Sequence, residues 1–149
     1  MRVVLKTIRN HFFSAFREIF VYHHTSLEFR AKTYAIIIAS SEEPIGRYLP
    51  ALKEIASEIY AESDRAGALV MTVKEYVVAA HAKKKISDHT LLNEIIQELR
   101  LMPRYAAKIE PEHLRKLQAC TQEQESQIYQ ERIIDFLREK RSEYDEFRR

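Results

Sequence analysis

The chain has 149 residues, of which 2 are Gly and 4 are Pro, whereas average usage gives about ten Gly and about seven Pro. Sandwiches, barrels and doubly wound sheets need many tight turns, so this shortage excludes them and also excludes a Gly-rich phosphate loop. One cysteine, 31% charged and 46% hydrophobic residues and a net charge of +2 indicate a globular, all-helical cytoplasmic protein, neither disordered nor membrane-spanning.

The first predicted helix covers residues 3–22 and is amphipathic. Its apolar face repeats at steps of three or four residues and consists of Leu5, Ile8, Phe12, Phe16 and Ile19. Phe13 and Phe20 widen this face. The rest of the helix is basic, with four basic side chains against Glu18 alone in residues 1–22.

A second helix is predicted to begin at Thr25, because Thr25 and Glu28 have the spacing of a capping box. It is followed by a connection over residues 40–46 and a third helix with Pro50 in its first turn, where the missing N–H is harmless. The expected buried positions of these two helices are Leu27, Tyr34, Ile37, Ile38, Leu52, Ile55, Ala56 and Ile59.

Ser63 and Asp64 mark the start of a fourth helix, which we expect to be the central one. Its apolar positions repeat at helical spacing and are Ala66, Leu69, Val70, Val73, Tyr76, Val77 and Ala80. The basic run Lys83–Lys85 lies at its end, where positive charge complements the helix dipole.

The next helix begins at Ser87 or Asp88 and should stop near Met102, because a proline follows. A short turn then leads to a helix opened by Pro111. Residues 118–127 contain almost no apolar side chains, so either one helix runs through solvent or the helix breaks. We favour the break, with Thr121 and Gln124 capping the last helix.

The predicted architecture is therefore a compact bundle of six or seven helices with amphipathic N- and C-terminal helices. Residues 1–149 form a single domain, and if any element projects from it, the C-terminal helix at about 122–147 is the strongest candidate.

The residues that could carry chemistry do not form a catalytic pattern. His23, His24 and Glu28 lie close in sequence, but Thr25 is expected to cap the helix between them and no HExxH motif occurs. Glu123 and Glu125 are expected to raise the thiol pKa of Cys120. We therefore expect no enzyme activity, no metal and no cofactor.

The sequence instead predicts a non-enzymatic protein that acts through self-association or a protein partner. In the last helix Asp135, Glu139 and Glu143 repeat at intervals of four, which is unfavourable in isolation. Basic side chains of a neighbouring copy, such as Arg138 and Arg141, would offset them. The candidate interface residues are Arg9, Phe12, Phe13, Phe16, Phe20, Ile133, Phe136, Leu137 and Tyr144.

Two further binding functions remain open. Nucleic acid could bind to the basic residues of the first helix and the lysine run, with an affinity that falls steeply with salt. Those residues are Arg2, Lys6, Arg9, Lys83, Lys84 and Lys85. The basic, Phe-rich first helix also fits the description of an anchor lying on a membrane surface, although we favour its packing on protein. A metal-dependent enzyme is a weaker alternative.

Overall fold

The computed structural model describes residues 25–83 and 87–146, and every regular element in them is a helix. The predicted all-α class is confirmed. The predictions for the first helix, its Phe residues and basic residues, His23 and His24 lie outside the described residues, as do those for Lys84 and Lys85. The side chain of Lys83 also lies outside them.

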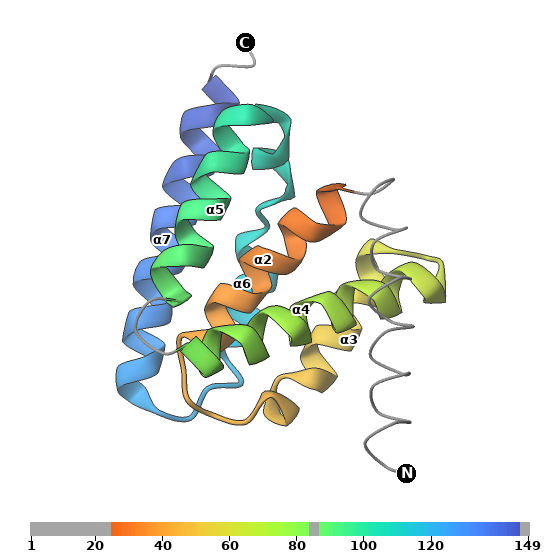
Figure 1. Cartoon of the computed structure of the whole chain (residues 1–149), viewed down its shortest axis with the longest axis vertical. Coiled ribbons are helices and arrows are strands. Elements are labelled where there is room, and N and C mark those ends of the chain that lie inside the picture. Colours follow the sequence, from red (N-terminus) through yellow and green to blue (C-terminus); the bar gives the residue numbers. More distant parts are fainter. Residues whose placement is uncertain (1–24, 84–86, 147–149) are drawn as a thin grey trace.

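The described elements follow the predicted order along the chain (Figure 1). The α-helices are α2 (Thr25–Ala39), α3 (Leu49–Ile59), α4 (Ser63–Lys83), α5 (Ser87–Leu101), α6 (Pro111–Gln118) and α7 (Gln124–Glu146). Two short 3-10 helices are η1 (Ile45–Arg47) and η3 (Pro103–Lys108). Pro50 and Pro111 occupy first-turn positions, and α5 ends before Pro103, as predicted.

Helix α2 is the central helix, and the prediction that α4 would be central is wrong. Helix α2 contacts α4, α5, α6, α7 and η3, and it crosses the middle of the molecule in Figure 1. Residues 34–39, its last part, are apolar or aromatic at every position and all buried, which is the pattern of a helix covered on every side. Helix α4 keeps one outer face, where Val78 is 63% exposed.

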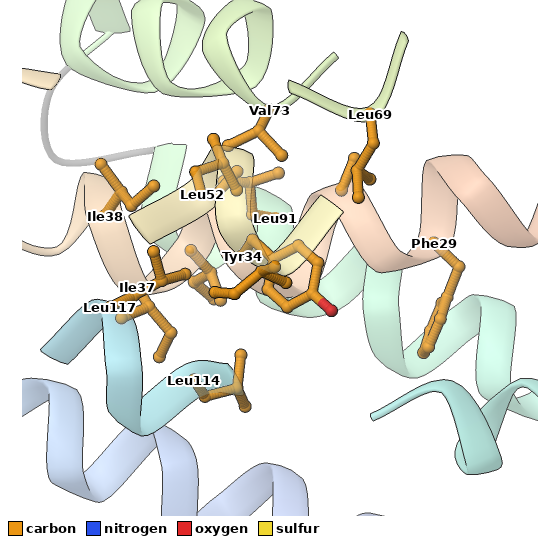
Figure 2. Packing of buried hydrophobic residues seen from close by; sticks show 14 of the residues in the cluster. Phe29, Tyr34, Ile37, Ile38, Leu52, Leu69, Val73, Leu91, Leu114 and Leu117 are labelled. Carbon is orange, nitrogen blue, oxygen red and sulfur yellow. The ribbon is translucent and has the colours of Figure 1, made fainter. Parts of the chain in front are cut away.

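The core forms around α2, and its composition agrees with the predicted apolar faces. In Figure 2, Tyr34, Ile37 and Ile38 of α2 lie between side chains of α3 and α4 on one side and of α6 on the other. The residues of α3 and α4 predicted to be apolar and found buried are Leu52, Ile55, Ala56, Ala66, Leu69, Val70, Val73, Val77 and Ala80, whereas Ile59 and Tyr76 are only partly buried. Helices α5 and α6 add Leu91, Ile95, Leu99, Leu114 and Leu117 to the core.

Helix α6 ends at Gln118 and α7 begins at Gln124, so residues 119–123 are a non-helical connection. This confirms the predicted break. The predicted cap is wrong, because α7 begins at Gln124 and the Gln127 N–H donates to the Glu123 carbonyl, which puts Thr121 outside the N-cap position. The Thr121 hydroxyl is instead buried, 2.7 Å from the Tyr48 hydroxyl. Tyr48 also lies 2.7 Å from the hydroxyl of Ser41 at the end of α2. The connection is further held by Glu43, whose carboxylate accepts a hydrogen bond from the Gln122 N–H at 3.0 Å.

Helix α7 packs along α6 and η3. Ile133, Ile134 and Leu137 are buried in the core, and the amide of buried Gln130 donates a hydrogen bond to the Ile37 carbonyl at 2.9 Å. Through these four residues the helix lies on the bundle rather than away from it. This position also brings later residues of α7 alongside the start of α6.

Candidate functional site

A surface cleft with a volume of about 880 Å³ opens where α2, α3, α6 and α7 meet. We call it the Arg30 cleft. Its lining is mainly charged and consists of Arg30, Glu58, Ile59, Glu110, Pro111, Glu112, His113, Arg115, Arg138 and Arg141.

Arg30 comes from the central helix and is only 8% exposed. Its Nη1 lies 3.3 Å from Oε1 of Glu110, yet Nη1 has no hydrogen-bond partner among the described residues. The ion pair therefore has a short distance without the directional geometry of a hydrogen bond. The guanidinium is held by charge beside Glu110, with the hydroxyls of Tyr34 and Tyr60 also next to it.

Glu110 and His113 continue the polar network from Arg30 across α6. Oε2 of Glu110 lies 2.5 Å from Nδ1 of His113, and the buried Tyr34 hydroxyl lies 3.1 Å from the same nitrogen. Nε2 of His113 faces Glu58 of α3 at 3.2 Å. His113 thus connects the start of α6 to both α2 and α3.

The phenols beside Arg30 remain neutral. Burial raises the pKa of Tyr34 well above its ordinary value, although the nearby charge of Arg30 acts in the opposite direction. Burial likewise raises the pKa of Tyr60 at the end of α3, again against the effect of Arg30. Neither hydroxyl is prepared to act as a general base, which needs a pKa near the working pH.

Glu58 remains ionised at the edge of the cleft. The Lys116 ammonium donates a hydrogen bond to Oε1 of Glu58 at 3.1 Å. This hydrogen bond and the charge of Lys116, together with a contribution from His113, lower the pKa of the Glu58 carboxyl. The carboxylate therefore contributes negative charge to the cleft at neutral pH.

The other cleft arginines are exposed or partly exposed, and each has an acidic partner. Arg115 donates to Glu131 at 2.9 Å, Arg138 lies 3.9 Å from Asp135, and Arg141 lies 3.8 Å from Asp145. Arg141 also donates to the Ile109 carbonyl. Arg138 and Arg141 were expected to offset acidic residues of a neighbouring copy. Each instead lies beside an acidic residue of its own helix, so no neighbouring copy is required to balance their charge.

The predicted interface residues of α7 lie in different environments. Ile133 and Leu137 are buried in the chain's own core, whereas Phe136 and Tyr144 are partly buried against it. The ammonium of Lys140 lies 5.5 Å from the centre of the Phe136 ring. The structure therefore does not gather these four side chains on one exposed face.

Cys120 has the predicted direction of pKa shift but a different cause. Burial of the thiol raises its pKa, against a smaller opposite effect of Arg47, and the thiol donates to the Lys116 carbonyl at 3.4 Å. In residues 25–83 and 87–146, no group of three His, Cys, Asp or Glu side chains could hold a metal ion. Within the same ranges, no helix is long and apolar enough to cross a membrane.

Sequence reasoning missed Arg30, Glu110 and His113. The sequence does not single out Arg30, because Glu28 and Lys32 stand two positions away on either side and charged and apolar residues alternate there. The convergence of Arg30, Glu110 and His113 could not be read from the chain, since Arg30 and Glu110 come from distant segments.

Comparison with known proteins identifies no family model, curated protein or solved structure that matches this chain. The fold and the cleft therefore define the protein only as an all-helical bundle with an arginine-containing cleft.

Proposed function

We propose that this protein acts by binding a segment of a partner protein in the Arg30 cleft rather than by catalysing a reaction. The observation that carries the proposal is the Arg30 cleft itself, a surface cavity of about 880 Å³ whose lining holds four arginines and three glutamates.

The size and composition of the cleft favour a peptide segment as the ligand. Its volume of about 880 Å³ lies within the range of about 300–1,000 Å³ that is typical of ligand sites. Its lining combines four arginines with three glutamates, and Ile59 and Pro111 add apolar surface. A segment with both acidic and basic side chains would match this mixture, and arginine is common among the residues that dominate protein interfaces.

Nucleic acid is a less favoured partner for the cleft. Glu58, Glu110 and Glu112 lie in the same lining as the arginines and would repel a phosphate backbone. Arg115 already pairs with Glu131 at 2.9 Å. The earlier nucleic-acid hypothesis rests on the first helix and the lysine run, and it predicts binding to a single-stranded DNA 20-mer that weakens steeply with salt.

Selection from a displayed library of random 12-residue peptides tests the proposal with the full chain. We expect peptides that bind the wild type, lose at least about tenfold in affinity for Arg138→Gln, and retain affinity for Arg132→Gln. Arg138 lines the cleft and Arg132 is an exposed residue of the same helix outside it, so the two variants change charge equally. Failure to enrich any peptide, or equal binding to both variants, would contradict the proposal.

A second copy of the chain is one form that the partner could take. Light scattering at two protein concentrations and two salt concentrations measures this directly. A dimer that Arg138→Gln dissociates would identify self-association through the cleft, whereas a monomer would assign the cleft to a different protein. Because the one cysteine of the chain is a free thiol and free thiols suit a reducing compartment, we propose the cytoplasm as the location.

A further inference from the structure

We propose that the segment bound in the Arg30 cleft carries a basic side chain that pairs with Glu112 and an acidic side chain that pairs with Arg138. This inference rests on the proposed function above and identifies the two residues that would give the cleft its specificity. They are the charged members of the lining that the rest of the bundle leaves most available to a ligand.

Most charged side chains of the lining have close partners in the chain itself. Glu58 accepts a hydrogen bond from Lys116 at 3.1 Å and faces His113 at 3.2 Å, and Arg115 donates to Glu131 at 2.9 Å. A ligand that used such groups would have to replace contacts already made, so the gain from binding them is small. The lining residues held in this way are Arg30, Glu58, Glu110, His113, Arg115 and Arg141.

Glu112 is the acidic side chain of the lining that stays available. It is exposed in the first turn of α6, and it makes no hydrogen bond or ion pair with any other residue that the structure describes. The hydrogen bond and charge of Glu58 raise the pKa of Lys116, and Glu112 makes the smallest contribution to this effect. A basic side chain of a ligand can therefore pair with Glu112 without displacing another group.

Arg138 is the arginine of the lining with the weakest internal pairing. It is 55% exposed, and its ion pair with Asp135 has a distance of 3.9 Å to a carboxylate that is itself 60% exposed. This distance is too long for a hydrogen bond, and exposed ion pairs contribute little to stability. The nearby Glu131 is already hydrogen-bonded to Arg115 and Gln118. Because arginine binds carboxylates through two parallel hydrogen bonds, an acidic side chain of a ligand can replace Asp135 with better geometry.

One contact between α7 and the start of α6 relates the positions of the two side chains. Arg141 of α7 donates to the Ile109 carbonyl, which lies just before α6. Arg138 and Glu112 are each three residues from this contact along the chain, and both line the same cleft. A 12-residue peptide extends to about 40 Å, so one peptide is long enough to reach both side chains.

Selection from the random 12-residue library with the full chain, followed by double-mutant cycles, tests this inference. The probe is the most enriched peptide, in which each acidic side chain is changed in turn to its amide and each basic side chain to Gln. We expect one acidic position to matter at least about fivefold for the wild type but not for Arg138→Gln. One basic position should likewise matter for the wild type but not for Glu112→Gln. An enriched peptide without both charges, or additive effects in both cycles, would overturn the inference.

A matched control separates Glu112 from glutamates outside the cleft. Glu112→Gln should weaken binding of the enriched peptide by at least about fivefold. Glu125 is also an exposed glutamate in the first turn of a helix but lies outside the lining, so Glu125→Gln should change the affinity by less than about twofold. In about 1 M NaCl the Debye length falls to about 3 Å, and the loss caused by Glu112→Gln should shrink. Equal losses for the two variants, or a loss that salt leaves unchanged, would overturn the role of Glu112.

The combined variant Glu112→Arg and Arg138→Glu reverses both charges. A peptide in which the acidic and basic positions are exchanged should bind this variant at least about tenfold more tightly than the original peptide does, and the opposite preference would overturn the inference. If the combined variant fails to fold, the single Gln variants at these exposed positions decide. Peptides that need the cleft but show no charge preference would contradict this inference and leave the proposed function supported, whereas the absence of any enriched peptide would contradict both.

Discussion

At the scale of single residues, buried polar side chains determine how the bundle is joined. The hydroxyl of Tyr48 lies 2.7 Å from each of the hydroxyls of Ser41 and Thr121, and all three residues are buried. Their contacts join the end of α2 and the start of α3 to the connection between α6 and α7. Buried hydroxyls in such a network are favourable only while each has a partner.

Tyr48→Phe should lower the free energy of unfolding by about 1–3 kcal/mol, because Ser41 and Thr121 would each lose a buried hydrogen-bond partner. Urea unfolding followed by circular dichroism measures the change. In the variant that also carries Thr121→Val, the second substitution should destabilise less than it does alone, since its partner is already absent. Additive effects would contradict a shared hydrogen bond.

The residues of the Arg30 cleft could not be identified as a site from their residue types alone. Arg30, Glu110 and His113 have ordinary sequence surroundings, and their roles depend on burial and on distances between segments. Glu110 and His113 are three residues apart at the start of α6, a spacing that also occurs in ordinary ion pairs.

At the scale of helices, ion pairs connect elements that the sequence cannot pair. Lys32 of α2 lies 3.0 Å from Glu98 and 3.4 Å from Glu94 on α5. Burial lowers the pKa of the Lys32 ammonium, but the hydrogen bond and charge of Glu98, with Glu94 and Glu28, outweigh it and the pKa is raised. This raised pKa means that the ion pairs stabilise the fold while Lys32 is protonated.

Lys32→Met should destabilise the protein by about 1–2 kcal/mol at pH 7, less than for fully buried pairs because both glutamates are partly exposed. The stabilisation is fully present below the ordinary lysine pKa of 10.5 and is lost as pH rises through the raised value. Thermal unfolding at pH 7, 9 and 11 should therefore show a difference from the wild type that shrinks at the highest pH. A constant difference would indicate lost packing instead.

The ion pair between Glu58 of α3 and Lys116 of α6 should stop stabilising the fold at low pH, whereas the Lys32 ion pairs stop doing so at high pH. The lowered pKa of Glu58, caused chiefly by Lys116, gives a stabilisation that is present above the ordinary value of 4.5 and lost as pH falls through the lowered value. Glu58→Gln should remove this part of the pH dependence. The exposed Glu42→Gln serves as the control and should keep the wild-type profile of thermal midpoint against pH; identical profiles for all three would contradict the prediction.

At the scale of the whole molecule, α7 completes the core. The buried residues Ile133, Ile134 and Leu137 would leave a large apolar surface if the helix were removed. Truncating one buried Leu or Ile to Ala costs about 2–5 kcal/mol, while a whole domain has about 5–15 kcal/mol of stability.

Deletion of residues 128–149 should therefore abolish cooperative unfolding, as measured by urea titration and by dispersion of amide signals. The double variant Ile128→Ser and Tyr129→Ser changes two exposed residues of α7 and should keep the fold. A cooperative, well-dispersed deletion variant would contradict a structural role for α7.

The sequence by itself determined the helical class, most helix boundaries and most of the core. These features depend on local properties, namely the shortage of glycine and proline, first-turn residues such as Pro50 and Pro111, and apolar spacing. The break between α6 and α7 was predictable for the same reason, because residues 118–127 contain almost no apolar side chains.

Only the tertiary structure decided which helix is central, which apolar residues of α7 are core, and where a charged cleft opens. An apolar face has the same spacing whether it packs on its own chain or on another, so Ile133 and Leu137 could be assigned to the core only from their burial. The Arg30 cleft brings together residues from 30 to 141 in the sequence. Its lining comes together only through the packing of α2, α3, α6 and α7, and local spacing along the chain does not determine that arrangement.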